Sequence, residues 1–248
     1  MDVLWILVLV PLVGLPVAVA VALFRGALAA GLSRRTATAV ATATVAGWGI
    51  WILTSGLLAR SGVYAQNEAA FNPWIPVALL GSLGVALLLT RLPVPARILA
   101  DPGTPARLAV PQTLRAVGVV FLVAMAMGQL PAVFALPAGL GDIAVGLAAP
   151  VVAWRLTRGT GRRGAVWFNI LGITDLVVAV GIGVLAGLGP DQVIPANPST
   201  AAVAELPMVL IPTTLVPLAL ALHIVSLRRL RSAPTAAPTP ALATTRLP

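Results

Sequence analysis

Two aspartates lie in strongly apolar stretches of this sequence, and both follow the pattern Gly-x-x-Asp-apolar-x-Val. The first stretch is residues 139–145, around Asp142, and the second is residues 172–178, around Asp175. An ionised carboxyl group in apolar surroundings is costly unless it is paired, hydrated or neutralised by a proton. Carboxyl groups at such positions are therefore candidates for holding a proton or a cation.

The composition assigns these aspartates to an integral membrane protein. Of the 248 residues, 59% are hydrophobic and 9% are charged, and the mean hydropathy is +1.01. Soluble domains carry about 25% charged residues, so this chain has too little polar surface to face water on every side. A membrane helix needs about 20 apolar residues. The sequence predicts an all-α bundle of about seven such helices, with no separate soluble domain.

The expected transmembrane domain covers residues 1–230. Its predicted spans are residues 3–24, 36–58, 74–90, 114–130, 139–156, 165–188 and 207–227. Residues 231–248 are rich in Ala, Pro and Thr, a composition that predicts a disordered tail. We expect the proline-rich segment 91–111 to be irregular and the charge-free link 131–137 to form a tight hairpin.

All sixteen basic residues are arginines, and they cluster in alternate loops. The basic segments follow the first, third, fifth and seventh predicted spans, and they contain Arg25, Arg34 and Arg35; Arg91, Arg97, Arg107 and Arg115; Arg158, Arg162 and Arg163; and Arg228, Arg229 and Arg231. Cytoplasmic loops of membrane proteins carry the excess of Arg and Lys. This pattern predicts an outer N-terminus, a cytoplasmic C-terminus, and a location in the plasma membrane or bacterial inner membrane, with the lipid bilayer as partner.

Asp175 lies near the middle of its predicted span, where an aspartate costs roughly 2.5–3.5 kcal/mol on insertion scales. No basic residue is expected at that depth, so Asp175 must be protonated or held by hydroxyl donors. Asn169 precedes it on about the same helix face, and Thr213 and Thr214 lie at a similar depth in the last predicted span. Asp175 is predicted to hold a proton or cation, or to join two helices as a neutral acid.

Asp142 lies about three residues inside the outer end of its predicted span. An acid in the first turn of a helix is stabilised by the unpaired amides and the dipole, so Asp142 has a structural explanation as well as a functional one. At 1.5 Å per residue the two aspartates differ in depth by roughly 10 Å. We therefore expect the two aspartates to be successive binding positions on one path and not to contact each other, with Gln129 and Glu205 nearer the outside.

Other chemistries are not indicated. The chain has no Cys, which excludes thiolate sites and disulfides, and no Lys, which excludes a P-loop and a retinal Schiff base. The net charge of +9 does not predict nucleic-acid binding, because the arginines flank apolar runs and form no patch with interleaved aromatic residues. We predict no cofactor and no metal site, and we expect the single histidine, His223, at the cytoplasmic interface.

Three functions follow from these residues. The first is transport of a small solute or ion through a path that involves Asp175, Asp142, Thr213, Thr214, Asn169, Gln129 and Glu205. The second is a non-catalytic structural or accessory membrane subunit, in which the two aspartates hold helices together. The third is an intramembrane enzyme acting on lipid, although no nucleophile, base and orienting group converge by spacing.

Overall fold

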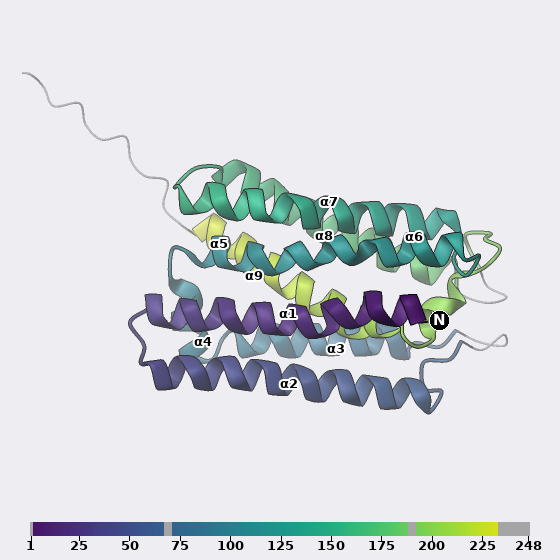
Figure 1. Cartoon of the computed structure of the whole chain (residues 1–248), viewed down its shortest axis with the longest axis horizontal. Coiled ribbons are helices and arrows are strands. Elements are labelled where there is room, and N and C mark those ends of the chain that lie inside the picture. The colour runs from purple at the N-terminus through teal and green to yellow at the C-terminus, as the bar shows by residue number, and fades with distance from the viewer. Residues whose placement is uncertain (1, 67–70, 188–191, 233–248) are drawn as a thin grey trace, which may run out of the picture.

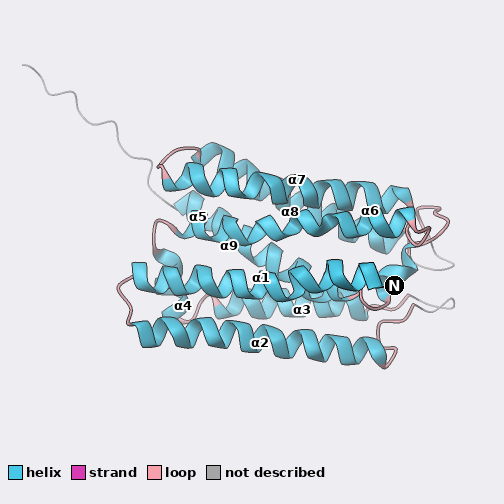
Figure 2. Cartoon of the chain, viewed as in Figure 1, coloured by secondary structure: helices cyan, strands magenta, loops and turns pink. Residues whose placement is uncertain are grey.

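The computed structural model describes residues 2–66, 71–187 and 192–232, and these residues form helices with no strand among them (Figure 2). The predicted all-α class is therefore confirmed. The longer helices are α1 (Asp2–Ala29), α2 (Arg34–Arg60), α3 (Trp74–Leu89), α7 (Ala132–Thr157), α8 (Arg162–Leu185) and α9 (Val216–Ser232). The shorter helical segments are α4 (Pro93–Ala100), α5 (Thr104–Ala109), η1 (Val110–Gly118), α6 (Val119–Ala126), η3 (Thr200–Ala204) and η4 (Ile211–Leu215). The predicted tail, residues 231–248, lies outside the described residues, apart from Arg231 and Ser232, which belong to α9.

Two groups of helices lie on either side of α9 (Figure 1). One group is α1, α2 and α3, and the other is α7, α8 and the run α5–η1–α6. The last helix crosses the molecule between them and contacts α3, α5 and α8. As a result, 78% of the residues in the apolar stretch of η4–α9 are buried inside the molecule, against 6% in that of α2.

Six helical runs are long and apolar enough to cross a membrane, and a seventh is obtained if α3 and α4, which meet at a bend of 79°, form one span. The six runs are Val3–Ala29, Arg34–Arg60, Thr104–Ala126, Ala132–Thr157, Arg162–Leu185 and Ile211–Ser232. Their length and composition agree with the membrane character that the sequence predicts.

Two segments that were expected to lack regular structure are helical. Much of segment 91–111 forms α4 and α5, and Pro93 and Pro105 stand in their first turns, where a missing N–H removes no helical hydrogen bond. The link 131–137 is the beginning of α7, which starts at Ala132. Both predictions are wrong, because proline marks the beginning of a helix as readily as its end.

Two of the long runs change their helical geometry part of the way along. η1 is a 3₁₀ segment between α5 and α6, and η4 is a π-helical turn before α9. Because Pro217 has no N–H, the carbonyl of Thr213 cannot accept from it. The indole N–H of Trp51 on α2 donates to that carbonyl instead, at 2.9 Å. Such irregular segments inside long helices often mark functional positions.

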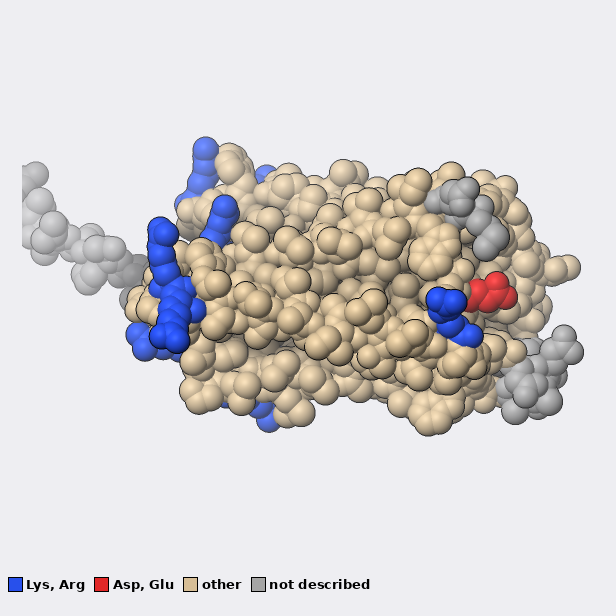
Figure 3. Space-filling view, turned by 60° about the horizontal axis from the view of Figure 1, so that its bottom comes forward, with Lys and Arg blue, Asp and Glu red and all other residues tan. Residues whose placement is uncertain are grey.

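Basic side chains gather at one end of the molecule (Figure 3). There the α1–α2 link, α4, the start of α8 and the end of α9 lie close together. Arg97 Nη2 donates to the carbonyl of Ala30 at 3.3 Å, Arg229 Nη2 to the carbonyl of Ala96 at 3.5 Å, and Arg162 Nη2 to the carbonyl of Leu230 at 2.5 Å. On the face that Figure 3 shows, the long middle part of the surface carries no charged side chain. We call this end of the bundle the arginine-rich end.

Candidate functional site

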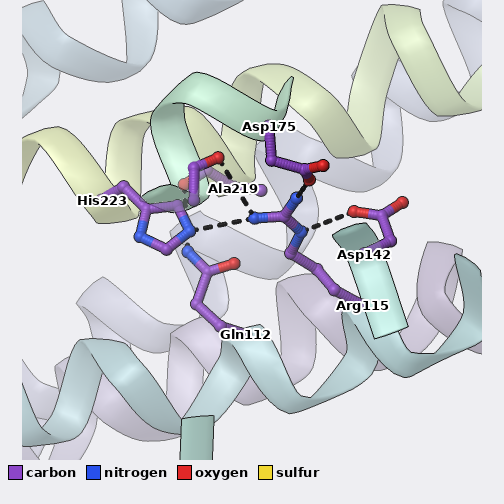
Figure 4. A network of polar contacts seen from close by, with 7 residues as sticks. Gln112, Arg115, Asp142, Asp175, Ala219 and His223 are labelled. Carbon is purple, nitrogen blue, oxygen red and sulfur yellow. Dashed lines mark hydrogen bonds and ion pairs between the residues drawn. The ribbon is translucent and has the colours of Figure 1, made fainter. Parts of the chain in front are cut away.

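Arg115 is the centre of a charged cluster inside the molecule (Figure 4). Its side chain comes from the 3₁₀ segment η1 and is 6% exposed. Nε donates to Asp142 Oδ1 on α7 at 2.7 Å, and Nη2 donates to Asp175 Oδ2 on α8. One guanidinium therefore binds both aspartates through separate N–H groups, which the forked shape of arginine permits.

The remaining nitrogen of Arg115 connects the cluster to α8 and α9. Nη1 donates to the carbonyl of Gly172 at 3.4 Å and lies 3.1 Å from His223 Nε2. Arginine has no acceptor, so His223 Nε2 must accept and the ring proton must sit on Nδ1, which donates to Asn169 Oδ1 at 3.0 Å. Asn169 Nδ2 in turn donates to the carbonyl of Ala165 at 2.7 Å. These contacts define His223 as a neutral ring.

The cluster carries one unbalanced negative charge when both carboxylates are ionised. Arg115 contributes one positive charge, Asp142 and Asp175 contribute one negative charge each, and neutral His223 contributes none. The aspartate side chains are 15% and 16% exposed. Within the described part of the chain, the carboxylate oxygens that Arg115 does not contact accept no hydrogen bond. One proton or one monovalent cation makes the cluster neutral.

Four glycines allow the helices to approach closely enough to build this cluster. A Cβ at each of them would lie between 1.7 and 2.4 Å from an atom of a neighbouring element. The four are Gly118, Gly141, Gly146 and Gly172. The closest case is Gly141, where a Cβ would lie 1.7 Å from Asp175 Oδ1, and at Gly172 it would lie 2.4 Å from His223 Nε2. The glycine that precedes Asp175 by three residues in the sequence pattern therefore makes room for the histidine ring.

We expect Gly141→Ala to lower the free energy of unfolding by about 1–3 kcal/mol, because the added methyl group displaces the Asp175 carboxylate. Gly81→Ala on α3 is the matched control, since nothing lies within 4 Å of a Cβ at that position. It should leave stability unchanged or raise it by about 0.5–1 kcal/mol. Thermal unfolding of the purified variants measures both changes. A Gly141→Ala variant as stable as the Gly81→Ala variant would contradict the close approach of α7 to Asp175.

A cavity of about 50 Å³, measured as the space open to the centre of a water molecule, adjoins the cluster. Arg115 and Asp142 line it, and the rest of its wall is apolar, with side chains such as Leu15, Phe121 and Leu176. One water needs roughly 10–15 Å³ on that measure. The cavity therefore has room for several waters, or for a small ligand, next to a carboxylate that has a free oxygen.

Three of the seven predicted site residues belong to the cluster, namely Asp142, Asp175 and Asn169. Thr213 and Thr214 are buried in η4, but their hydroxyls donate to carbonyls four residues earlier, at 2.7 and 2.5 Å. The Thr213 hydroxyl also accepts from Ser55 Oγ on α2 at 2.8 Å, in a contact that attaches η4 to α2. The described hydrogen bonds of these two threonines thus lead away from the aspartates.

The other two predicted site residues lie apart from the cluster. Gln129 is in the turn between α6 and α7, and Glu205 is an exposed residue directly after η3. Both are at the end of the bundle opposite the arginine-rich end. Neither residue contacts Arg115 within the described hydrogen bonds.

Three expectations about this region are corrected. A basic residue does lie at the depth of Asp175, because Arg115 binds it. Asp142 is well inside α7 rather than in a first turn, because that helix begins at Ala132, and Arg115 bridges it to Asp175. His223 is 0% exposed rather than interfacial, because α9 lies between the two helix groups.

One further buried group was not predicted from the sequence. Gln112 lies one turn before Arg115 and is 1% exposed, and its Nε2 donates to the carbonyl of Ala219 at 3.0 Å. Its Oε1 has no hydrogen-bond partner among the described residues. Figure 4 shows this amide beside His223 and Arg115. A buried acceptor without a partner is uncommon in folded proteins.

Comparison with known proteins identifies one related family. No curated protein and no solved structure matches the chain. Residues 72–231 match the family described as Domain of unknown function (DUF8737), and this region includes Arg115, both aspartates and His223. Because the match covers more than half of the 248 residues, the chain belongs to the DUF8737 family.

Proposed function

We propose that this is an integral membrane protein of the plasma or bacterial inner membrane, with its N-terminus outside and its C-terminus in the cytoplasm. The apolar surface supports this: Ile50, Leu53 and Leu147 are 66%, 69% and 65% exposed, and apolar surface of this extent requires a covering such as lipid. The gathering of the arginines at one end supports the orientation, since the positive end of a membrane protein faces the cytoplasm.

Single cysteines test the orientation cleanly, because the chain has no cysteine of its own. Ser61→Cys, after α2, should react with a membrane-impermeant maleimide in intact cells. Thr160→Cys, in the α7–α8 turn, should react only after the cells are opened. Both residues are exposed, so accessibility does not distinguish them. Labelling of Thr160→Cys in intact cells would reverse the proposed orientation.

We further propose that the protein transports a small solute or ion, and that the cluster of Arg115, Asp142 and Asp175 holds the proton or cation that is exchanged. The observation that carries this proposal is the unbalanced negative charge of a buried cluster beside an open cavity. Ionisable groups inside a membrane are costly and usually mark ion or proton pathways. One carboxylate balances the charge of one arginine, so the second carboxylate leaves a negative charge that a proton or cation can neutralise.

A structural role is the second candidate, and one observation favours it. The guanidinium of Arg115 connects η1 to α7, α8 and α9 through the contacts described above. A lock of this kind holds three helices even when nothing moves through the protein. The two functions differ in whether the carboxylates exchange protons with water.

Infrared difference spectroscopy on lipid-embedded protein separates these two functions. If the cluster exchanges protons, wild-type spectra at two pH values should differ by a carboxyl C=O band. That band should be missing from the double variant Asp142→Asn/Asp175→Asn, which has no acidic group in the cluster. A spectrum without this band at every pH at which the fold survives would leave the structural role and remove the transport proposal.

A further inference from the structure

The cavity beside the cluster is followed by a second cavity, nearer the end opposite the arginine-rich end. The second cavity measures about 90 Å³, and Gln66 and Thr200 line it at that end. Phe121, Ile211 and Val216 line both cavities. The two cavities are therefore neighbours that share a wall of three apolar side chains, and we call the pair of cavities the route.

The wall of this route suits a weakly hydrated cation. Phe71, Phe121 and Phe134 line the second cavity, and the rings of Phe121 and Phe134 meet edge to face with centroids 5.4 Å apart. Aromatic faces attract cations, most strongly those that have lost their water. Hard ions such as Mg²⁺ and Ca²⁺ instead need about six or more oxygen ligands, and Asp142 is the one carboxylate among the described lining residues of both cavities.

The polar end of the first cavity offers an acceptor rather than a donor. Asp142 lines this cavity and has one carboxylate oxygen that Arg115 does not contact. Arg115 lines it as well, but its nitrogens already donate to Asp142, Asp175 and the carbonyl of Gly172 and contact His223. A ligand with N–H donors complements the carboxylate oxygen of Asp142.

We propose that the solute is a small protonated amine, a monovalent ammonium ion with a short apolar body, which enters through the second cavity and binds at Asp142 in exchange for a proton. This inference rests on the proposed transport function and names its substrate class. The exchange balances in charge. The cluster holds one proton when empty, the proton leaves to water as the ammonium binds, and the cluster is neutral in both states. An anion would give the neutral cluster a net negative charge and is not a candidate.

Isothermal titration calorimetry on the full chain in lipid nanodiscs tests this inference, with n-butylammonium, tetramethylammonium and Na⁺ as probes. The n-butylammonium ion should bind most tightly, because it has both N–H donors and an apolar body, and tetramethylammonium should bind more weakly because it has no N–H. The heat should change with the ionisation enthalpy of the buffer, as release of about one proton requires. Binding of Na⁺ equal to that of n-butylammonium, or no binding of the amine at millimolar concentration, would overturn the inference.

Two variants test the route itself. Asp142→Asn should weaken n-butylammonium binding at least about tenfold, since it removes a charge-assisted hydrogen bond. Phe121→Leu should weaken it between about 2-fold and 30-fold through the lost ring face. Phe24→Leu on α1 is the control, because Phe24 lines neither cavity among the described lining residues. Equal binding by the Phe121 and Phe24 variants would contradict the route.

The infrared band distinguishes failure of this inference from failure of the proposed function. If the amine does not bind but the carboxyl band still changes with pH, the proton site stands and the substrate is of another class. If the amine does not bind and the band is missing as well, both proposals fall.

Discussion

Arg115→Gln is expected to lower the free energy of unfolding by about 3–5 kcal/mol, the usual effect of removing one partner from a buried ion pair. The variant leaves two carboxylates side by side in a largely apolar interior, and neither has a cation to balance it. Glutamine also replaces the N–H groups that reach α7, α8 and His223 with a single amide. Low yield and early thermal unfolding in detergent should follow.

Removing both carboxylates together with Arg115 is expected to restore stability. Arg115→Gln/Asp142→Asn/Asp175→Asn removes every formal charge from the cluster and leaves amides that can hydrogen-bond to one another, so most of the lost stability should return. Arg60→Gln, at the exposed end of α2, is the control for loss of an arginine and should change stability by less than about 0.5 kcal/mol. A triple variant no more stable than Arg115→Gln alone would contradict charge imbalance as the cause.

The helical class could be predicted and the two aspartates could be singled out from the sequence, because both depend on local composition. Apolar runs of sufficient length predict helices that can cross a membrane whatever they pack against, and an aspartate in such a run is conspicuous. The Gly-x-x-Asp pattern also carried information about packing. The structure explains the glycine at 172, which makes room for His223, while the importance of Gly141 follows only from its contact with Asp175.

The depth of Arg115 inside the bundle was missed because Arg115 was grouped with the arginines of the preceding loop. Arg107 and Arg115 are eight residues apart, and at roughly 1.5–2.0 Å per residue in α-helix and 3₁₀-helix this separation is roughly 12–16 Å. That distance is about half of a 30 Å hydrocarbon layer. The available signal was an imbalance: two acids in apolar runs had no base assigned to them, and Arg115 directly precedes the uncharged apolar run 116–127.

His223 and Gln112 were inaccessible to sequence reasoning for a different reason. Their burial depends on α9 lying between two groups of helices, which is a property of the whole bundle and not of any one run. A histidine near the end of an amphipathic run is usually at an interface. In this fold the last helix has its neighbours on both sides, so a residue near its end is still inside.

Asp142→Asn and Asp175→Asn should each abolish the movement of charge that a pH jump produces in wild-type protein adsorbed on a solid-supported membrane. The wild-type cluster has two carboxylates and one guanidinium, so one negative charge is available to take up a proton. Either variant leaves one carboxylate beside one guanidinium, a neutral pair with no unbalanced charge. The transient current should fall to that of a protein-free membrane in both cases.

These single variants should keep their fold, which is what separates function from structure at this site. Asparagine retains an oxygen that can accept from Arg115, and the repulsion between the two aspartates disappears, so we expect stability within about 1 kcal/mol of wild type. Arg115→Gln, in contrast, unbalances the charge and should lose stability. If both asparagine variants unfold as readily as Arg115→Gln, the cluster acts as a helix lock. If both fold but still move charge, the proton binds elsewhere. Loss of current in two well-folded proteins is the result that only an exchangeable proton at the pair of aspartates explains.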